Sequence, residues 1–184
     1  MISSEELEIL SFYRASELAG AILLGKLALQ TGNDRLREPL TEQMAEEARH
    51  AWLFTKLIME LGATPLRMTR TYQSEVGRVY GLPSSMLDIL CLTQVLEVEV
   101  LDHYIRHAQM PNLHPAVRKT LETIIEDERG HVDWIKAELD GYGQRRGPGR
   151  VEAAMRKAER ARAAVFETLR HTKTAENYFG DLLR

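Results

Sequence analysis

Two short stretches of the sequence, Glu47-Ala-Arg-His50 and Glu128-Arg-Gly-His131, share the pattern Glu-x-x-His, and no other stretch of the chain has it. Residues three apart lie on one face of a helix, so each stretch directs a carboxylate and an imidazole toward the same point. A lone glutamate in an apolar stretch precedes each of them, Glu17 before the first and Glu97 before the second. The two glutamates are 80 residues apart and the two Glu-x-x-His stretches 81. The sequence therefore predicts two matching halves, each with three metal-binding side chains.

Apolar residues at helical spacing predict four long helices, each with its candidate ligands on the apolar face. We expect them over residues 5–30, 33–61, 84–108 and 115–139. Residues 63–84 form a long connection with a short helix around 70–80. The predicted fold is all-α: an antiparallel four-helix bundle with one long crossover.

The C-terminal part of the chain is predicted to add to this bundle without forming a second domain. We expect one domain over 1–184: the bundle in 1–140, a flexible basic linker in 141–149, and a fifth helix and tail in 150–184. The apolar tail residues are expected to dock on the bundle or on a second subunit, and they are Tyr178, Phe179, Leu182 and Leu183. Residues 140–184 carry ten Lys or Arg against six Asp or Glu. A solvated basic helix face explains this excess, and an anionic substrate or partner is the more specific alternative.

The composition is that of an ordinary globular protein, with 44% hydrophobic and 28% charged residues. The single cysteine, Cys91, excludes an internal disulfide framework and a CxxC metal site. We see no signal peptide and no apolar stretch long enough for a membrane span. A cytoplasmic protein is the expectation.

The six candidate ligands suit two divalent metal ions. Four carboxylates balance the charge of two such ions, glutamates can bridge them, and one imidazole per ion fixes its orientation. Without metal, burying these charges in one core would be strongly unfavourable. The carboxylate-rich set favours iron, with manganese as the second candidate, over zinc.

Side chains near the six candidates are predicted to support the site. Asp127 can accept the outward N–H of a ligand histidine, and Tyr13 and Tyr104 can donate hydrogen bonds or relay an electron, although ordinary core tyrosines are commoner. Glu99 lies two residues from Glu97, so it points elsewhere on the helix and is not a candidate ligand. The four remaining histidines match no ligand spacing, and they are His103, His107, His114 and His171.

On these residues, the segment 5–140 resembles the ferritin-like superfamily, which includes bacterioferritin, rubrerythrin and the bacterial di-iron oxidases and hydroxylases. The resemblance implies a four-helix bundle that binds two iron ions. It implies Glu17 and Glu97 as the ligands from single-ligand helices, and Glu47, His50, Glu128 and His131 as the paired ligands.

Three functions follow from this resemblance. The first is a non-haem di-iron oxygenase or oxidase that activates O2 and oxidises or hydroxylates an organic substrate, with electrons from an external donor. The second is bacterioferritin-like iron oxidation and storage, and the third is rubrerythrin-like peroxide scavenging or non-catalytic metal binding. We favour the first, because the tail exceeds a short fifth helix and the small residues Gly20, Ala21 and Gly130 suggest space for a substrate. A homodimer is a candidate assembly. A family member that hydroxylates modified tRNA would use the basic C-terminal segment, but no RNA-binding motif supports a nucleic-acid partner.

Overall fold

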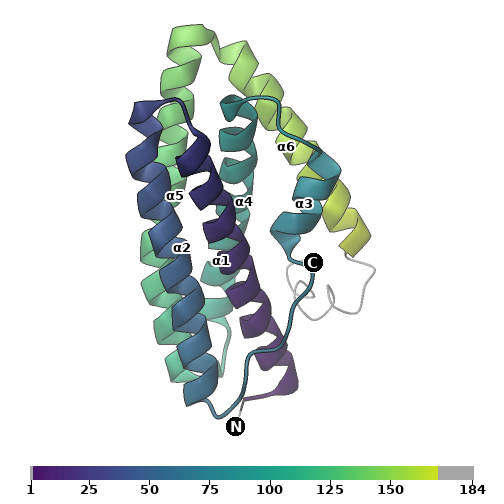
Figure 1. Cartoon of the computed structure of the whole chain (residues 1–184). Helices are drawn as coiled ribbons and strands as arrows, with labels where there is room; N and C mark the ends of the chain where they lie inside the picture. Colours follow the sequence, from purple (N-terminus) through teal and green to yellow (C-terminus); the bar gives the residue numbers. More distant parts are fainter. Residues whose placement is uncertain (1, 170–184) are drawn as a thin grey trace. The chain divides into compact units, whose positions relative to one another are not determined.

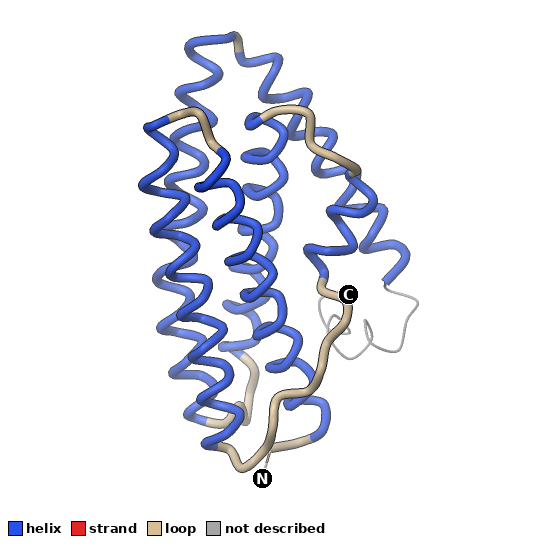
Figure 2. The backbone as a smooth tube through the Cα atoms, in the orientation of Figure 1, coloured by secondary structure: helices blue, strands red, loops and turns tan. Residues whose placement is uncertain are grey.

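The computed structural model describes residues 2–169, and within them it contains helices and no strand. Figure 1 follows the helices along the chain, and Figure 2 separates them from the loops. The helices are α1 (Ser4–Gln30), α2 (Asp34–Glu60), α3 (Tyr72–Tyr80), α4 (Met86–Gln109), α5 (Pro115–Arg146) and α6 (Pro148–Leu169). The all-helical fold class and the short helix in the crossover are confirmed.

Side-chain caps define where the long helices begin. The Ser3 hydroxyl accepts the Glu6 N–H at 3.0 Å at the start of α1, and the Ser85 hydroxyl accepts the Asp88 N–H at 3.1 Å at the start of α4. The Asn33 side chain caps α2 in the same way. Each cap satisfies a backbone donor that has no partner within its own helix. The helix starts that the sequence predicted near these residues are therefore correct.

The described residues form two compact units, and the first comprises 2–74 and 114–120. In it, α1 and α2 run side by side as an antiparallel hairpin joined by a short turn (Figure 1). The hairpin buries apolar side chains along its length: Leu10, Leu24, Leu40, Phe54 and Ile58. The Arg14 side chain donates to the Thr55 hydroxyl at 2.7 Å and ties the two helices together.

The second unit comprises the described residues 75–113 and 121–169, which contain α4, α6 and most of α5. Its fully buried side chains include Ile124, Ile135 and Ala158. The helix α6 packs against α4, where the Arg162 guanidinium donates to the Glu99 carboxylate at 2.7 Å.

The second unit also holds the end of α3 through Tyr80. Its hydroxyl donates to the Asp88 carboxylate at 3.1 Å, and the Lys157 ammonium lies 3.9 Å from the centre of its ring.

The predicted linker at 141–149 is wrong for most of its length. The helix α5 continues past Leu139 to Arg146, and α6 begins at Pro148, so Gly147 alone separates the two helices. Gly147 has a φ of 92°, a conformation that favours glycine, and it makes this turn. The glycines at 141 and 143 carry only a modest helix penalty, which packing overcomes.

Other predictions about the chain as a whole stay predictions. The tail residues predicted to dock, 178–183, lie outside the described residues, and the single-domain assignment remains an expectation. Within 2–169, no helix is both long enough and apolar enough to cross a membrane.

Candidate metal centre

The first unit brings together Glu17 from α1 and Glu47 and His50 from α2. Each offers one ligand atom, and these atoms lie within 4.8 Å of one another. The His50 Nδ1 atom is 3.3 Å from the Glu17 Oε2 atom. Glu17, Glu47 and His50 are 2%, 5% and 0% exposed. We call this group the first triad.

The second unit repeats this arrangement with Glu97 from α4 and Glu128 and His131 from α5, which we call the second triad. Its ligand atoms also lie within 4.8 Å of one another. The His131 Nδ1 atom is 3.1 Å from the Glu128 Oε2 atom and 3.9 Å from the Glu97 Oε2 atom. Glu128 and His131 are buried, and the Glu97 side chain is 12% exposed. The structure therefore brings each predicted half together within its own unit.

The donor set of each triad fits a metal ion. Two carboxylates and one imidazole offer hard oxygen and borderline nitrogen ligands, a combination that suits divalent iron or manganese. Two carboxylates this close repel each other, and their burial removes the water that would otherwise solvate them. A bound cation relieves both costs.

Gln43 is a supporting residue that was not among the predicted side chains of the site. Its Nε2 atom donates to the Glu47 Oε1 atom at 3.2 Å, and the Gln43 side chain is 1% exposed. It lies four residues before Glu47, so the two share one face of α2. This four-residue spacing is the feature of the sequence from which the contact could have been predicted. The hydrogen bond fixes one carboxylate oxygen of Glu47 and so orients the other.

Gly20 serves a different purpose from the one predicted. A Cβ atom at Gly20 would lie 3.0 Å from the Glu47 Oε2 atom, so the Glu47 carboxylate occupies the room that the glycine leaves. Gly130 is exposed, and no atom lies within 4 Å of its Cβ position. These two glycines therefore give no evidence of substrate space beside the triads.

The predicted supporting side chains have varied surroundings. Tyr13 packs against Phe54 with ring centres 5.6 Å apart, and burial, with a smaller contribution from the charge of Glu6, raises its pKa above the ordinary value. Tyr104 is fully buried and Asp127 is half-buried. Their roles at the site stay predictions.

Glu99 belongs to neither triad. Its carboxylate accepts from Arg162 and lies 3.7 Å from the His103 Nε2 atom. Its exclusion from the candidate ligands therefore agrees with its surroundings.

Comparison with known proteins adds one finding. The family model described as p-aminobenzoate N-oxygenase AurF matches residues 17–176, which is most of the chain and includes both triads. This is a family of di-iron, ferritin-like oxygenases, so the predicted superfamily is confirmed. Among curated proteins, none matches the sequence.

Proposed function

The chain belongs to the AurF family of di-iron oxygenases, and from this we propose that its two triads together bind two iron ions and that the enzyme oxygenates the nitrogen of an amine. Family membership makes the protein an oxygenase with a di-iron cofactor. The ligand residues and the amine substrate are the proposed part.

The observation that carries the proposal is the matched composition of the triads. Each unit offers two glutamates and one histidine with ligand atoms within 4.8 Å, and the family match spans both sets. Six ligands with four carboxylates are what a carboxylate-bridged pair of metal ions requires. We therefore assign Glu17, Glu47 and His50, with Glu97, Glu128 and His131, as the iron ligands.

The iron ions, when bound, supply the activation of O2. The protein side chains do the rest. Burial of the triads excludes water from the reacting groups. His50 and His131 would each hold an iron ion through one ring nitrogen, and Gln43 holds Glu47 in place through its amide N–H. Side chains held in this way would fix the orientation of the bound ions.

The reaction needs an outside source of electrons. Converting an amine to a hydroxylamine inserts one oxygen atom of O2 into an N–H bond. The second oxygen atom leaves as water, which requires two protons and two electrons beyond the two that the nitrogen gives up. We propose that a separate reductase supplies them. A homodimer remains a prediction.

The family match separates the three functions that the sequence left open. An oxygenase family supports the first of them over iron storage and over peroxide scavenging. The family description names p-aminobenzoate, so this amine is the first substrate to test, followed by other aromatic and aliphatic amines.

The test begins with anaerobic loading of the apoprotein with Fe(II), removal of unbound metal and a count of iron per chain. Isotopically labelled O2, a chemical reductant and the amine then follow, with mass spectrometry of the product. We expect two irons per chain and one labelled oxygen on nitrogen. Glu47→Ala and His131→Ala should abolish the binding of two irons and the formation of labelled product. Glu42→Ala, at an exposed position, should change neither the iron content nor the product. Labelled product from either triad variant at the wild-type rate would refute the assignment.

A further inference from the structure

The outer side of the α1–α2 hairpin carries a row of exposed apolar side chains. On α1 these are Leu18, Ile22 and Leu29, and on α2 they are Trp52 and Met59. Leu29 is 87% exposed, and Ile22, Trp52 and Met59 are each more than half exposed. Single apolar residues are common on protein surfaces, whereas a contiguous apolar patch marks an interaction site. We name these five residues the outer patch.

The outer patch faces away from the first triad. Successive residues of an α-helix are about 100° apart around its axis. Ile22 and Trp52 each follow the triad glutamate of their own helix by five residues, which places them about 140° from it. Leu29 and Met59 each follow it by twelve residues, which places them about 120° from it. The outer patch therefore lies on the side of both helices opposite the candidate ligands.

The two rows of the outer patch lie next to each other. Arg14 and Thr55, whose side chains bond across the hairpin at 2.7 Å, lie about 60° and 80° from the same glutamates, in the same sense of rotation. Positions at about 100–140° on each helix then lie just outside this line of contact. The α1 row and the α2 row thus border one seam and form one surface.

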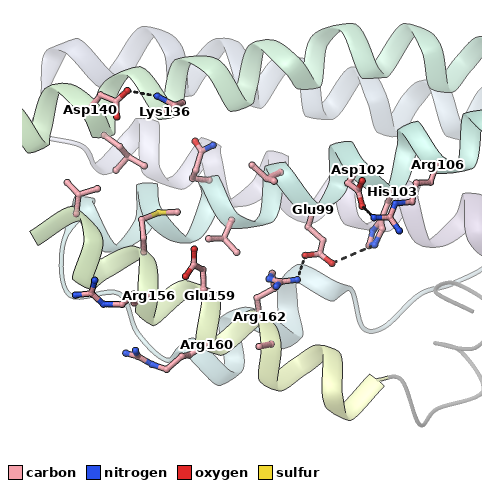
Figure 3. Close-up of a pocket in the computed structure, with 17 residues that line it drawn as sticks. Glu99, Asp102, His103, Arg106, Lys136, Asp140, Arg156, Glu159, Arg160 and Arg162 are labelled. Carbon is pink, nitrogen blue, oxygen red and sulfur yellow. Dashed lines mark hydrogen bonds and ion pairs between the residues drawn. The ribbon is translucent and has the colours of Figure 1, made fainter. Parts of the chain in front are cut away.

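The corresponding side of the second unit is built differently. On α5, the residues five and twelve positions after the triad glutamate are Asp133 and Asp140, both exposed and charged. On α4, the residue five positions after the triad glutamate is Asp102, which pairs with Arg106 at 2.8 Å beside a pocket that α6 also lines (Figure 3). The first unit has no helix in the place of α6, because besides α1 and α2 it holds only loops and the first turns of α3 and α5. The two halves match at the candidate ligands, but only the first has an exposed apolar outer side.

The outer side of the hairpin has the size of a stable protein interface. Each of the two helices has 27 residues, which is about 40 Å at a rise of 1.5 Å per residue, and two helices side by side are about 20 Å wide. The resulting face measures roughly 800 Å², the area that each partner contributes to a specific interface of standard size. Tryptophan and methionine are enriched in such interfaces.

Charged side chains along the outermost edge of α2 change sign midway. The edge comprises the residues within about 40° of the point opposite Glu47. In its first half, Glu38 and Glu42 are exposed and make no ion pair with any residue of the described chain. In its second half, Arg49 and Lys56 are exposed cations. The edge has two further charged residues, which are paired within α2, Asp34 with Arg37 at 3.3 Å and Glu60 with Lys56 at 3.7 Å.

This charge pattern is complementary to itself. Glu38 and Lys56 are 18 residues apart on one helix, about 27 Å, so they cannot pair within one copy. Two copies whose α2 helices run in opposite directions bring the acidic half of each edge to the basic half of the other. A second copy of the chain therefore satisfies both the apolar area and the charges of this surface.

We propose that the outer patch is a self-association surface, on which a second copy of the chain docks in an antiparallel, two-fold arrangement. Glu38 of each copy pairs with Lys56 of the other. The midpoint of this pairing is Glu47, which lies beside Gly20 of α1, so Leu18 of one copy faces Ile22 of the other across the axis. Because the surface lies opposite the first triad, association requires no iron.

The experiment is sedimentation equilibrium of the full chain, with and without iron, from about 1 to about 100 µM, a range that brackets the weaker interfaces of this size. We expect a monomer–dimer equilibrium with no larger species in both preparations. The melting temperature should rise with protein concentration, because association stabilises the folded chain by mass action. A monomer at every concentration, as when the C-terminal tail or another protein covers the patch, would overturn the proposal.

Substitutions in the apolar part locate the interface. Ile22→Lys should abolish the dimer, because it places two cations near the two-fold axis. Trp52→Ala should weaken the dimer about 30-fold, since tryptophan is among the residues that dominate binding at interface centres. Val79→Lys is the control, because Val79 is an exposed apolar residue of α3, outside the patch. A dimer that withstands both patch substitutions would place the interface elsewhere and refute the assignment.

A charge exchange tests the antiparallel pairing. Glu38→Lys and Lys56→Glu should each weaken the dimer about fivefold, because a two-fold interface contains the exposed pair twice. The double variant should recover most of the lost affinity, since the exchanged charges meet again between the copies. Glu126→Lys, at an exposed position of α5, is the control and should leave the dimer unchanged. A double variant that associates no more tightly than either single variant would overturn the proposed arrangement.

Discussion

Gln43→Leu is the sharpest test of how the first triad is held. Leucine keeps most of the side-chain volume at a position that is 1% exposed, but it removes the 3.2 Å hydrogen bond from the Gln43 Nε2 atom to the Glu47 Oε1 atom. The Glu47 carboxylate then loses its fixed orientation. Gln43 is not itself a proposed ligand, so the substitution changes the support of the site and not its donor set.

The expected magnitude follows from what such partners contribute at metal sites. Removing a hydrogen-bond partner of a ligand typically lowers metal affinity 10- to 100-fold, which is about 1.4–2.8 kcal/mol. We place Gln43→Leu toward the lower end, since a hydrogen bond of 3.2 Å is at the long limit for N–H···O.

The assay is anaerobic titration of the apoprotein with Fe(II) against a chelator of known affinity, alongside thermal melting. Gln30→Leu is the control, because Gln30 is exposed at the end of α1. We expect weaker iron binding by Gln43→Leu and unchanged binding by the control. Wild-type affinity in a folded Gln43→Leu protein would show that this hydrogen bond does not position Glu47.

Three further predictions concern single contacts. Gly20→Ala places a Cβ atom 3.0 Å from the Glu47 Oε2 atom, so iron occupancy should fall. The melting temperature should not fall, because alanine favours the helix more than glycine does. Iron occupancy equal to that of the wild type would contradict the close approach. Arg162→Met leaves the mostly buried Glu99 carboxylate without its 2.7 Å partner. It should lower the melting temperature by about 2–4 °C, because a pair whose arginine is one-third exposed contributes about 1 kcal/mol to stability. Arg162→Lys should recover part of this loss. Burial raises the pKa of the Cys91 thiol to about 11, so the thiol stays protonated at pH 8. Iodoacetamide at pH 8 should therefore label Cys91 only after the protein is unfolded. Intact-mass measurement before and after unfolding checks this.

Most of the candidate site was predictable from the sequence because its candidate ligands obey local rules. A spacing of three residues places Glu47 with His50 and Glu128 with His131 on any α-helix. Each single glutamate, Glu17 and Glu97, stood out because a charge in an apolar stretch is costly without a partner. The serine and asparagine caps at the helix starts act within the first turn of their own helix, so their chemistry is also local.

The end of α5 was not predictable in this way. Glycine lowers helix propensity by about 1 kcal/mol, so Gly141 looked like a helix end. Packing contributes comparable energies over several residues and carried the helix to Arg146. The predicted role of Gly20, to leave space for a substrate, was also wrong, because the Glu47 carboxylate of another helix fills that space.

The sequence by itself thus determined the helices, the two matching sets of candidate ligands and, through the family, the di-iron oxygenase chemistry. Only the tertiary structure decided that Gln43 supports Glu47 and that Glu99 pairs with Arg162. The reason is physical. Helical spacing is a property of neighbouring residues, whereas ion pairs and cavities depend on which side chains of distant segments meet, and no local pattern encodes that.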